Sequence, residues 1–206
     1  MSIRQIIGKT LFKKAFYGKS MINTKRVVFL GSLLQHVIYQ KIKGDIIECG
    51  VWRGGSLKAM EHAVIDAHST KHIYGLDTFE GHPYTDEGTA HIKGHLSDTD
   101  YEKVSHQFPQ PTPVKLKKGL FADTFPSLKK KTFCFAHLDC DLYQSYKECI
   151  EFIYPRMETG GIIYFDDYNS PSAKRSNKAI HEYFKKNELV ILPNKQAYYI
   201  VTDGKQ

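Results

Sequence analysis

Two short acidic motifs each follow an apolar stretch of the sequence. Asp139 and Asp141 follow one stretch, and the adjacent Asp166 and Asp167 follow the next. Carboxylates that converge at neighbouring strand ends raise one another's pKa by repulsion unless a cation is present. Because all these ligands would be oxygens, we expect Mg²⁺, with Mn²⁺ or Ca²⁺ as alternatives. Zinc is disfavoured because no histidine or thiolate is suitably spaced.

A divalent cation at these acids could activate a hydroxyl group. A sugar hydroxyl has a pKa near that of water, about 15.7, whereas that of an aspartate base is about 3.9. At roughly 1.36 kcal/mol per unit the mismatch is on the order of 16 kcal/mol, so a carboxylate alone cannot remove the proton. A metal-bound hydroxyl is far more acidic. The structural alternative is that both motifs only cap helices and solvate loops.

A glycine-rich segment, Gly50 to Gly55, lies where a short strand is expected to turn into a helix beginning at Ser56. Glycine lets the backbone approach a ligand closely, and a helix N-terminus suits a carboxylate such as that of a methionine moiety. Asp77 follows Gly54 by 23 residues, at the end of the second strand, where an acid can accept hydrogen bonds from both ribose hydroxyls. The spacing differs from the GxGxxG of dinucleotide enzymes, and no Walker lysine follows. The alternative is a plain glycine turn and a loop aspartate that caps the next segment.

The elements that would position these residues alternate between strands and helices. We expect strands at 45–48, 72–76, 114–118, 132–138, 161–165, 190–192 and 198–201. We expect helices at 3–16, 26–42, 56–67 and 143–153, one announced by a capping box at 99–102, a short turn near 122, and one at 173–186. This order predicts an α/β fold with a doubly wound, mostly parallel sheet, and the last two strands as a hairpin or edge addition. In such sheets ligands bind beyond the carboxyl ends of the strands.

The composition is that of one ordinary globular domain, with 206 residues, 41% of them apolar. No apolar run reaches the roughly 18 residues of a membrane span, and the N-terminus lacks a secretory signal stretch. The four cysteines show neither CxxC pairing nor metal-ligand spacing, so we expect free thiols and a cytoplasmic location. The basic residues behind the net charge of +7 are scattered along the sequence. This distribution favours a solvated surface over an anionic substrate or membrane face, and disfavours nucleic acid.

At these residues the chain resembles the macrocin O-methyltransferase family, whose known members methylate sugars of macrolide and aminocoumarin antibiotics. The matching segments are GDIIECGVWRGGS (44–56), LDTFEG (76–81), KGLFADTFP (118–126), HLDCDLYQS (137–145) and YPRMETGGIIYFDDY (154–168). The resemblance implies a class I methyltransferase, Rossmann-like sheet of seven strands, with S-adenosylmethionine and Mg²⁺ as cofactors. The chain is shorter than typical members at its N-terminus and before Ser97, where members usually build substrate recognition.

The resemblance also implies roles for individual residues. By motif position, Asp139, Asp166 and Asp167 would hold the metal, and Asp141 would be the general base. The cofactor would be bound by Glu48, Gly50, Gly54, Ser56, Asp77, Thr78, Ser97, Gly119, Leu120 and Asp139. Residues 1–43 would form an N-terminal helical lid segment and residues 44–206 the methyltransferase domain. The N-terminal helices are also a candidate surface for forming a homo-oligomer.

The expected activity is in-line methyl transfer from S-adenosylmethionine to a hydroxyl of a sugar or glycosylated metabolite. One alternative is a metal-dependent methyltransferase of catechols or other phenols, and another is a non-catalytic cofactor-binding module. His91 and His95 suggest a metal site only weakly compared with a solvated loop, and His137 is expected to be a core histidine. Four aromatic residues fit stacking on a sugar ring as well as core packing: Trp52, Tyr84, Tyr143 and Tyr168.

Overall fold

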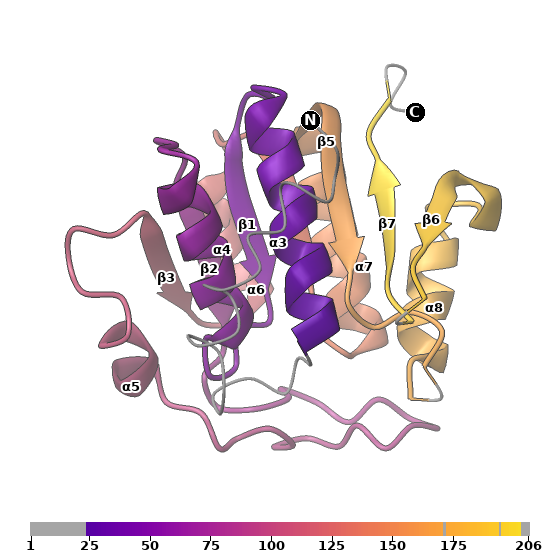
Figure 1. The fold of residues 1–206 in the computed structure, drawn as a ribbon. Coiled ribbons are helices and arrows are strands. Elements are labelled where there is room, and N and C mark those ends of the chain that lie inside the picture. Colours follow the sequence, from indigo (N-terminus) through magenta and orange to yellow (C-terminus); the bar gives the residue numbers. More distant parts are fainter. Residues whose placement is uncertain (1–23, 171, 194, 203–206) are drawn as a thin grey trace.

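Seven strands form one sheet in the order β3-β2-β1-β4-β5-β7-β6 in the computed structural model, which describes residues 24–170, 172–193 and 195–202 (Figure 1). The strands are β1 (Asp45–Cys49), β2 (Ile73–Asp77), β3 (Val114–Lys118), β4 (Phe133–Leu138), β5 (Met157–Phe165), β6 (Leu189–Ile191) and β7 (Ala197–Ile200). The first five strands pair in parallel, whereas β7 is antiparallel to both β5 and β6. The predicted doubly wound, mostly parallel sheet is therefore confirmed, with the last two strands as a hairpin at one edge.

Helices cover both faces of the sheet. The longer ones are α3 (Thr24–Tyr39), α4 (Gly55–Asp66), α7 (Tyr143–Ile153) and α8 (Lys174–His181), and the short ones are α5 (Tyr101–Ser105), α6 (Phe121–Thr124), η1 (Phe125–Leu128), η2 (Tyr154–Arg156) and η3 (Lys186–Glu188). In Figure 1, α3 and α4 lie in front of the sheet, and α6, α7 and α8 lie behind it. The carboxyl ends of the parallel strands therefore meet at one edge of a three-layer fold.

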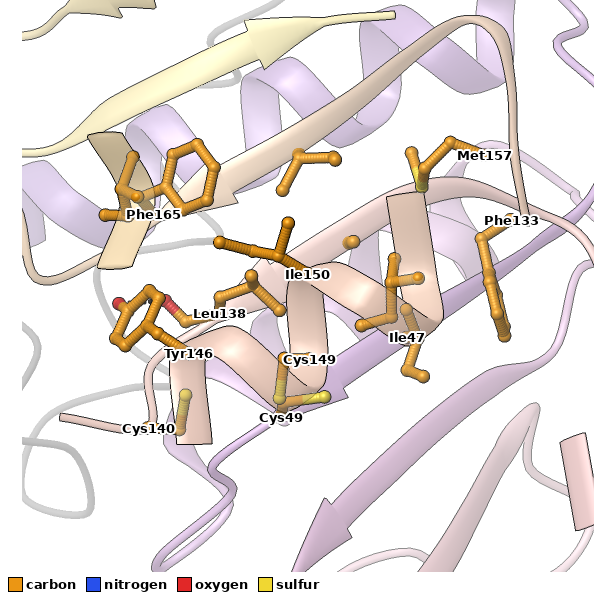
Figure 2. Packing of buried hydrophobic residues seen from close by; sticks show 14 of the residues in the cluster. Ile47, Cys49, Phe133, Leu138, Cys140, Tyr146, Cys149, Ile150, Met157 and Phe165 are labelled. Carbon is orange, nitrogen blue, oxygen red and sulfur yellow. Dashed lines mark hydrogen bonds between the residues drawn. The ribbon is translucent and has the colours of Figure 1, made fainter. Parts of the chain in front are cut away.

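The core consists of two apolar clusters, one on each face of the sheet. Neighbouring residues of β1 face opposite ways: Ile46 belongs to the cluster under α3 and α4, and Ile47 to the one under α7. Both side chains are fully buried. Figure 2 shows the second cluster, in which Ile150 of α7 packs near Leu138 and Phe165. Burial on both faces explains why these strands are apolar throughout rather than alternating.

Helix α3 is part of the sheet's own packing. Its side chains Leu30, Leu34 and Val37 are essentially buried, in the same cluster as residues of α4 and β5. The described part of the segment 1–43 is thus a layer of the fold. The helix expected at 3–16 lies outside the described residues, and a lid before residue 24 stays a prediction.

Three local expectations differ from the structure. The capping box at 99–102 is wrong: the N-cap of α5 is Asp100, whose carboxylate accepts the Lys103 backbone N–H at 2.8 Å. The Thr99 hydroxyl instead donates to the Trp52 carbonyl. Strand β5 begins at Met157 rather than at 161, because an irregularity in its pairing with β4 accommodates the glycines that suggested a turn. Helix α8 ends at His181, and the chain then turns so that Phe184 is buried in the core.

All four cysteines are free and buried, as the sequence predicted for thiols without pairing motifs. Cys49, Cys140 and Cys149 gather in the cluster of Figure 2. Cys140 packs into this core between two aspartates of the acidic motif, and burial raises the pKa of its thiol to about 11. It is therefore a core residue rather than a ligand. Among the described residues, no helix is long and apolar enough to cross a membrane.

Candidate active site

One cavity of about 510 Å³ lies at the carboxyl ends of the parallel strands. Its volume falls in the range of small-molecule sites, about 300–1,000 Å³. Of the residues that the sequence singled out for the site, those that line the cavity are Gly50, Ser56, Asp77, Thr78, Gly119, Leu120, Asp139, Asp141, Asp166 and Asp167. Glu48, Gly54 and Ser97 do not line it. The acidic motifs and the glycine turn thus share one chamber.

Asp77 ties the glycine-rich turn to the end of β2. Its Oδ2 accepts the backbone N–H groups of Val51 and Trp52, both at 2.8 Å, and its Oδ1 accepts the N–H of Phe79 at 2.7 Å. The carboxylate therefore holds the loop between β1 and α4 in place. The contact of Asp77 with a ribose stays a prediction. The structure shows in addition that Asp77 shapes this loop.

Replacing Asp77 with asparagine should weaken cofactor binding. The asparagine amide cannot accept all three N–H groups, because only its oxygen is an acceptor. Its NH2 group is a donor and would face a backbone N–H, which is also a donor. A hydrogen bond to a charged group contributes about 1.5–3 kcal/mol, so we expect the Kd for S-adenosylmethionine to rise about 10- to 150-fold in calorimetry. Asp66→Asn at the exposed end of α4 is the control, and an equal effect there would contradict the assignment.

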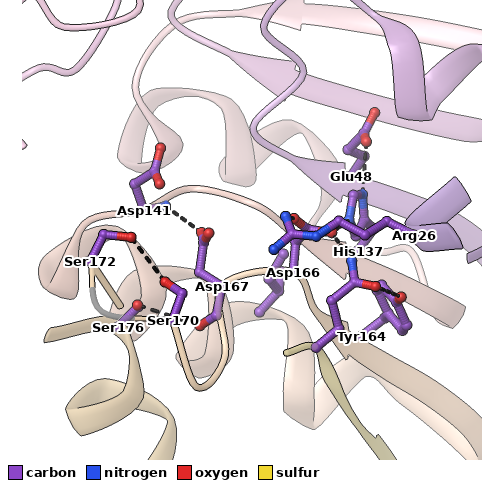
Figure 3. A network of polar contacts seen from close by, with 12 residues as sticks. Arg26, Glu48, His137, Asp141, Tyr164, Asp166, Asp167, Ser170, Ser172 and Ser176 are labelled. Carbon is purple, nitrogen blue, oxygen red and sulfur yellow. Dashed lines mark hydrogen bonds and ion pairs between the residues drawn. The ribbon is translucent and has the colours of Figure 1, made fainter. Parts of the chain in front are cut away.

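A row of charged side chains in contact with one another lies beneath the acidic motifs (Figure 3). Glu48 is fully buried, and its Oε1 lies 2.8 Å from His137 Nδ1. The other ring nitrogen of His137 is 3.7 Å from Asp166 Oδ1. Arg26 Nη1 donates to Asp166 Oδ2 at 2.5 Å, and the Gln196 amide donates to Asp166 Oδ1. Glu48, predicted to lie near the cofactor, thus lies under the site and supports it.

His137 is held in its charged form by these neighbours. Burial alone would lower its pKa, but its contacts with Asp166 and Glu48 raise that pKa to about 10. The histidine is a fully buried residue, as predicted, and it supplies a positive charge between two carboxylates. Together with Arg26 it partly balances the acids at the ends of β4 and β5.

The remaining acids retain an excess of negative charge. Burial raises the pKa of Asp139 well above its usual value, and the charges of Asp166 and Asp167 raise it further. Burial and then the charges of Asp141 and Asp166 do the same for Asp167. A cation would relieve this repulsion, and oxygen donors are what Mg²⁺ prefers, so the residues fit a divalent ion.

The carboxylates of the metal-binding set point in two directions. Those of Asp139 and Asp166 group with His137, with one donor atom of each within 4.8 Å of the others. Asp167 turns toward Asp141, whose backbone N–H donates to Asp167 Oδ2 at 3.2 Å (Figure 3). A shared ion at all three carboxylates therefore stays a prediction.

Asp141 has a left-handed backbone, with φ of 56°. Aspartate tolerates this conformation better than most residues. The turn places its side chain on the cavity wall, and His82 Nε2 lies 3.1 Å from Asp141 Oδ2. Asp141 is thus accessible from the cavity and held by an imidazole.

Several residues of this region were missed by sequence reasoning. Arg26, His82 and Gln196 reach the acids from distant segments, and no spacing signal points to them. Trp52 and Tyr84 line the cavity, whereas Tyr168 is buried in the core and Tyr143 does not line the cavity. The expectation of a solvated loop holds for His95, which is exposed, and is wrong for His91, which is only 9% exposed.

Comparison with known proteins identifies the family. Residues 13–193 match the macrocin O-methyltransferase (TylF) family. The chain belongs to this family. It is therefore an S-adenosylmethionine-dependent O-methyltransferase, and the family, fold and enzyme class expected from the sequence are confirmed.

Individual known proteins align over most of this chain. This chain is 30% identical over 178 residues to the 8-demethyl-8-(2,3-dimethoxy-alpha-L-rhamnosyl)-tetracenomycin-C 4'-O-methyltransferase of Streptomyces olivaceus. The alignment covers 80% of this chain and 67% of that protein. The chain is 28% identical over 199 residues to the demethyldecarbamoylnovobiocin O-methyltransferase of Streptomyces niveus, covering 87% and 74%. The solved structure of the O-methyltransferase NovP superposes with a TM-score of 0.75 at 26% identity, covering 89% and 82%.

Proposed function

We propose that this methyltransferase transfers the methyl group of S-adenosylmethionine to a hydroxyl of a sugar or glycosylated metabolite, with Mg²⁺ held by Asp139, Asp166 and Asp167. The observation that carries the proposal is that these acids line the same cavity as the turn after β1. The relative named for a rhamnosyl-bearing tetracenomycin supports a glycosylated acceptor.

The donor half of the cavity is built by β1, β2 and the start of α4. Helix α4 begins after Gly54, whose own backbone is in the left-handed conformation. No side chain caps the described N-terminus of the helix. Its first N–H groups therefore suit the carboxylate of the methionine moiety. Thr78 and the Gly119-Leu120 turn line the same half and would contact the nucleoside.

The acidic half would position the acceptor and receive its proton. A divalent cation held there would lower the pKa of the acceptor hydroxyl and neutralise developing negative charge. Asp141, whose side chain is 21% exposed, would collect the proton, and its contact with His82 would keep the carboxylate oriented. Arg26 and His137 would hold Asp166 in place.

The remaining wall carries groups that suit a sugar. Tyr84, Gln144, Ser145 and Glu148 line the cavity, and so does Phe121. Burial raises the pKa of Tyr84 to about 12, so its hydroxyl stays protonated. It accepts the Ser145 backbone N–H at 2.8 Å, which fixes it at the start of α7. The polar groups would pair with sugar hydroxyls, and an aromatic residue of the same cavity would pack against a sugar face.

Metal removal tests the proposal. Exhaustive dialysis against a chelator should abolish methyl transfer, and added Mg²⁺ should restore it, while calorimetry still detects cofactor binding. Acceptors would be a panel of nucleotide sugars and aryl glycosides beside catechol, with methyl-labelled S-adenosylmethionine. Transfer that persists without metal would overturn the metal role. Transfer to catechol and to none of the sugars would overturn the acceptor class.

A further inference from the structure

Three histidines of the loop between β2 and α5 gather beside Asp141. One ring nitrogen of each of His82, His91 and His95 lies within 4.8 Å of the other two. The ring centroids are 5.4 Å apart for His82 and His91, 5.4 Å for His82 and His95, and 6.3 Å for His91 and His95. The acidic site described above uses none of these rings as a metal ligand.

The backbone of the loop brings the three rings together. The N–H of His82 donates to the carbonyl of His95 at 2.8 Å, and the N–H of Gly94 donates back to the carbonyl of His82 at 2.9 Å. The N–H of Asp86 donates to the carbonyl of His91, also at 2.9 Å. Gly81 makes this possible, because a Cβ there would lie 2.6 Å from the His95 carbonyl oxygen. The cluster is thus preformed by a folded loop.

The loop is also fixed to the body of the protein. Asp86 is 3% exposed, its Oδ1 accepts Arg175 Nε at 3.0 Å, and its Oδ2 accepts the Tyr143 N–H at 3.1 Å. These contacts join the loop to α8 and to the start of α7. The three imidazoles therefore have a defined place relative to the cavity.

Two of the rings have a buried nitrogen that needs a partner. His82 and His91 are each only 9% exposed. In the part of the chain that the structure describes, Nδ1 of both rings is buried without a hydrogen-bond partner. A buried polar atom left unpaired destabilises a fold, so the presence of two such atoms requires an explanation.

We propose that His82, His91 and His95 bind a divalent transition-metal ion of the zinc class, separate from the acidic site. His82 would bind through Nδ1, since its Nε2 contacts Asp141 at 3.1 Å. A carboxylate on the second ring nitrogen is the usual outer partner of a metal-binding histidine, because it fixes the tautomer and the ring orientation. Asp141 also brings negative charge to the cluster, with its Oδ1 4.0 Å from His91 Nδ1.

The ligand chemistry separates this site from a magnesium site. Imidazole nitrogens suit zinc, cobalt, nickel and copper, whereas Mg²⁺ prefers oxygen. With metal–nitrogen bonds of 2.0–2.1 Å, ligand nitrogens of a tetrahedral site lie about 3.3 Å apart. Each pair of these ring nitrogens, now within 4.8 Å of one another, would therefore approach by at most about 1.5 Å, through side-chain rotation of the three histidines. The ion would fix the loop and, through His82, the orientation of Asp141.

Cobalt binding tests the site without any acceptor, so the result is independent of the proposed function. Tag-free, chelator-stripped full-length protein would be titrated with Co²⁺ in excess Mg²⁺. We expect one equivalent to bind with the intense visible absorption of a four-coordinate ion, and Zn²⁺ to displace it. Loss of a residue that only hydrogen-bonds to a metal ligand lowers metal affinity about 10- to 100-fold. His95→Gln removes a ligand itself, so it should lower the affinity for cobalt at least as much.

Three further variants make the test specific. His36→Gln, at an exposed position of α3, is the matched control and should bind cobalt like the parent protein. Asp139→Asn should also retain this cobalt, whereas His95→Cys should bind it with a new thiolate charge-transfer band. Thermal denaturation confirms that each variant is folded. The proposal is overturned by no tight cobalt binding in excess Mg²⁺, by an unchanged affinity in His95→Gln, or by loss of this cobalt in Asp139→Asn.

Discussion

Asp139→Asn is expected to abolish methyl transfer while making the metal-free protein more stable. Asp139 is partly buried beside Asp166 and Asp167, so its ionised form is unfavourable in the fold and its pKa is raised. A neutral amide of nearly the same shape removes that repulsion together with a proposed metal ligand. Loss of the cation's charge stabilisation, worth several kcal/mol, should lower kcat by about a thousandfold or more.

The pH dependence of stability gives this prediction a clear sign. A carboxyl group with a raised pKa stabilises the fold below its unfolded pKa of about 3.9, and this contribution is lost as pH rises through the folded pKa. The metal-free parent protein should therefore lose stability above about pH 4, and Asp139→Asn should flatten that decline. Mg²⁺ should raise the Tm of the parent far more than that of the variant.

Thermal denaturation with and without Mg²⁺, beside turnover and cofactor calorimetry, would measure all three effects. Asp66→Asn at an exposed position controls for the chemical change alone. If Asp139→Asn lost cofactor binding in proportion to activity, Asp139 would be a structural residue of the donor half. If it kept activity within tenfold, the acidic site would not hold a catalytic ion.

The elements that position the site were predictable because their signals are local. The bounds of β3 and α7 agree with the sequence prediction, since each has its own hydrophobic pattern and boundary signals. Parallel strands present their carboxyl ends at one edge, so the positions of Asp77, Asp139 and Asp166 on the cavity wall follow from the strand order. Periodicity and topology together predict which residues share an edge.

The partners of those acids could not be predicted, because they depend on register and on distant contacts. Glu48 was expected at the cofactor because it precedes the glycine turn, yet it pairs in register with His137 of β4 and is fully buried. Arg26 reaches Asp166 from 140 residues earlier in the chain. The histidine cluster depends on the folded loop, and only His91 and His95 were noticed in the sequence.

Gly50→Ala, directly after β1, is expected to be the most damaging of the glycine-to-alanine changes. Gly50 has φ of +93°, and a Cβ there would lie 1.9 Å from the carbonyl oxygen of Asp139. The two backbones are this close because Asp139 N–H donates to the Cys49 carbonyl at 2.9 Å, at the point where β1 and β4 both end. One added methyl group would thus disturb the donor turn and the acidic motif together.

Gly88→Ala separates the clash from the backbone strain. Gly88 also has positive φ, +77°, but a Cβ there would meet nothing within 4 Å. The left-handed conformation costs an alanine about 1–2 kcal/mol, and an overpacked core costs about 1–3 kcal/mol more. We therefore expect Gly50→Ala to lower the free energy of unfolding by about 2–5 kcal/mol, or the Tm by roughly 4–20 °C, and Gly88→Ala by about 1–2 kcal/mol.

Because the clash displaces Asp139, Gly50→Ala should also weaken cofactor binding and the Mg²⁺-induced rise in Tm, neither of which strain alone would change. Equal losses in the two variants would show that β1 and β4 can separate without cost, and that the glycine is there only for its backbone angle.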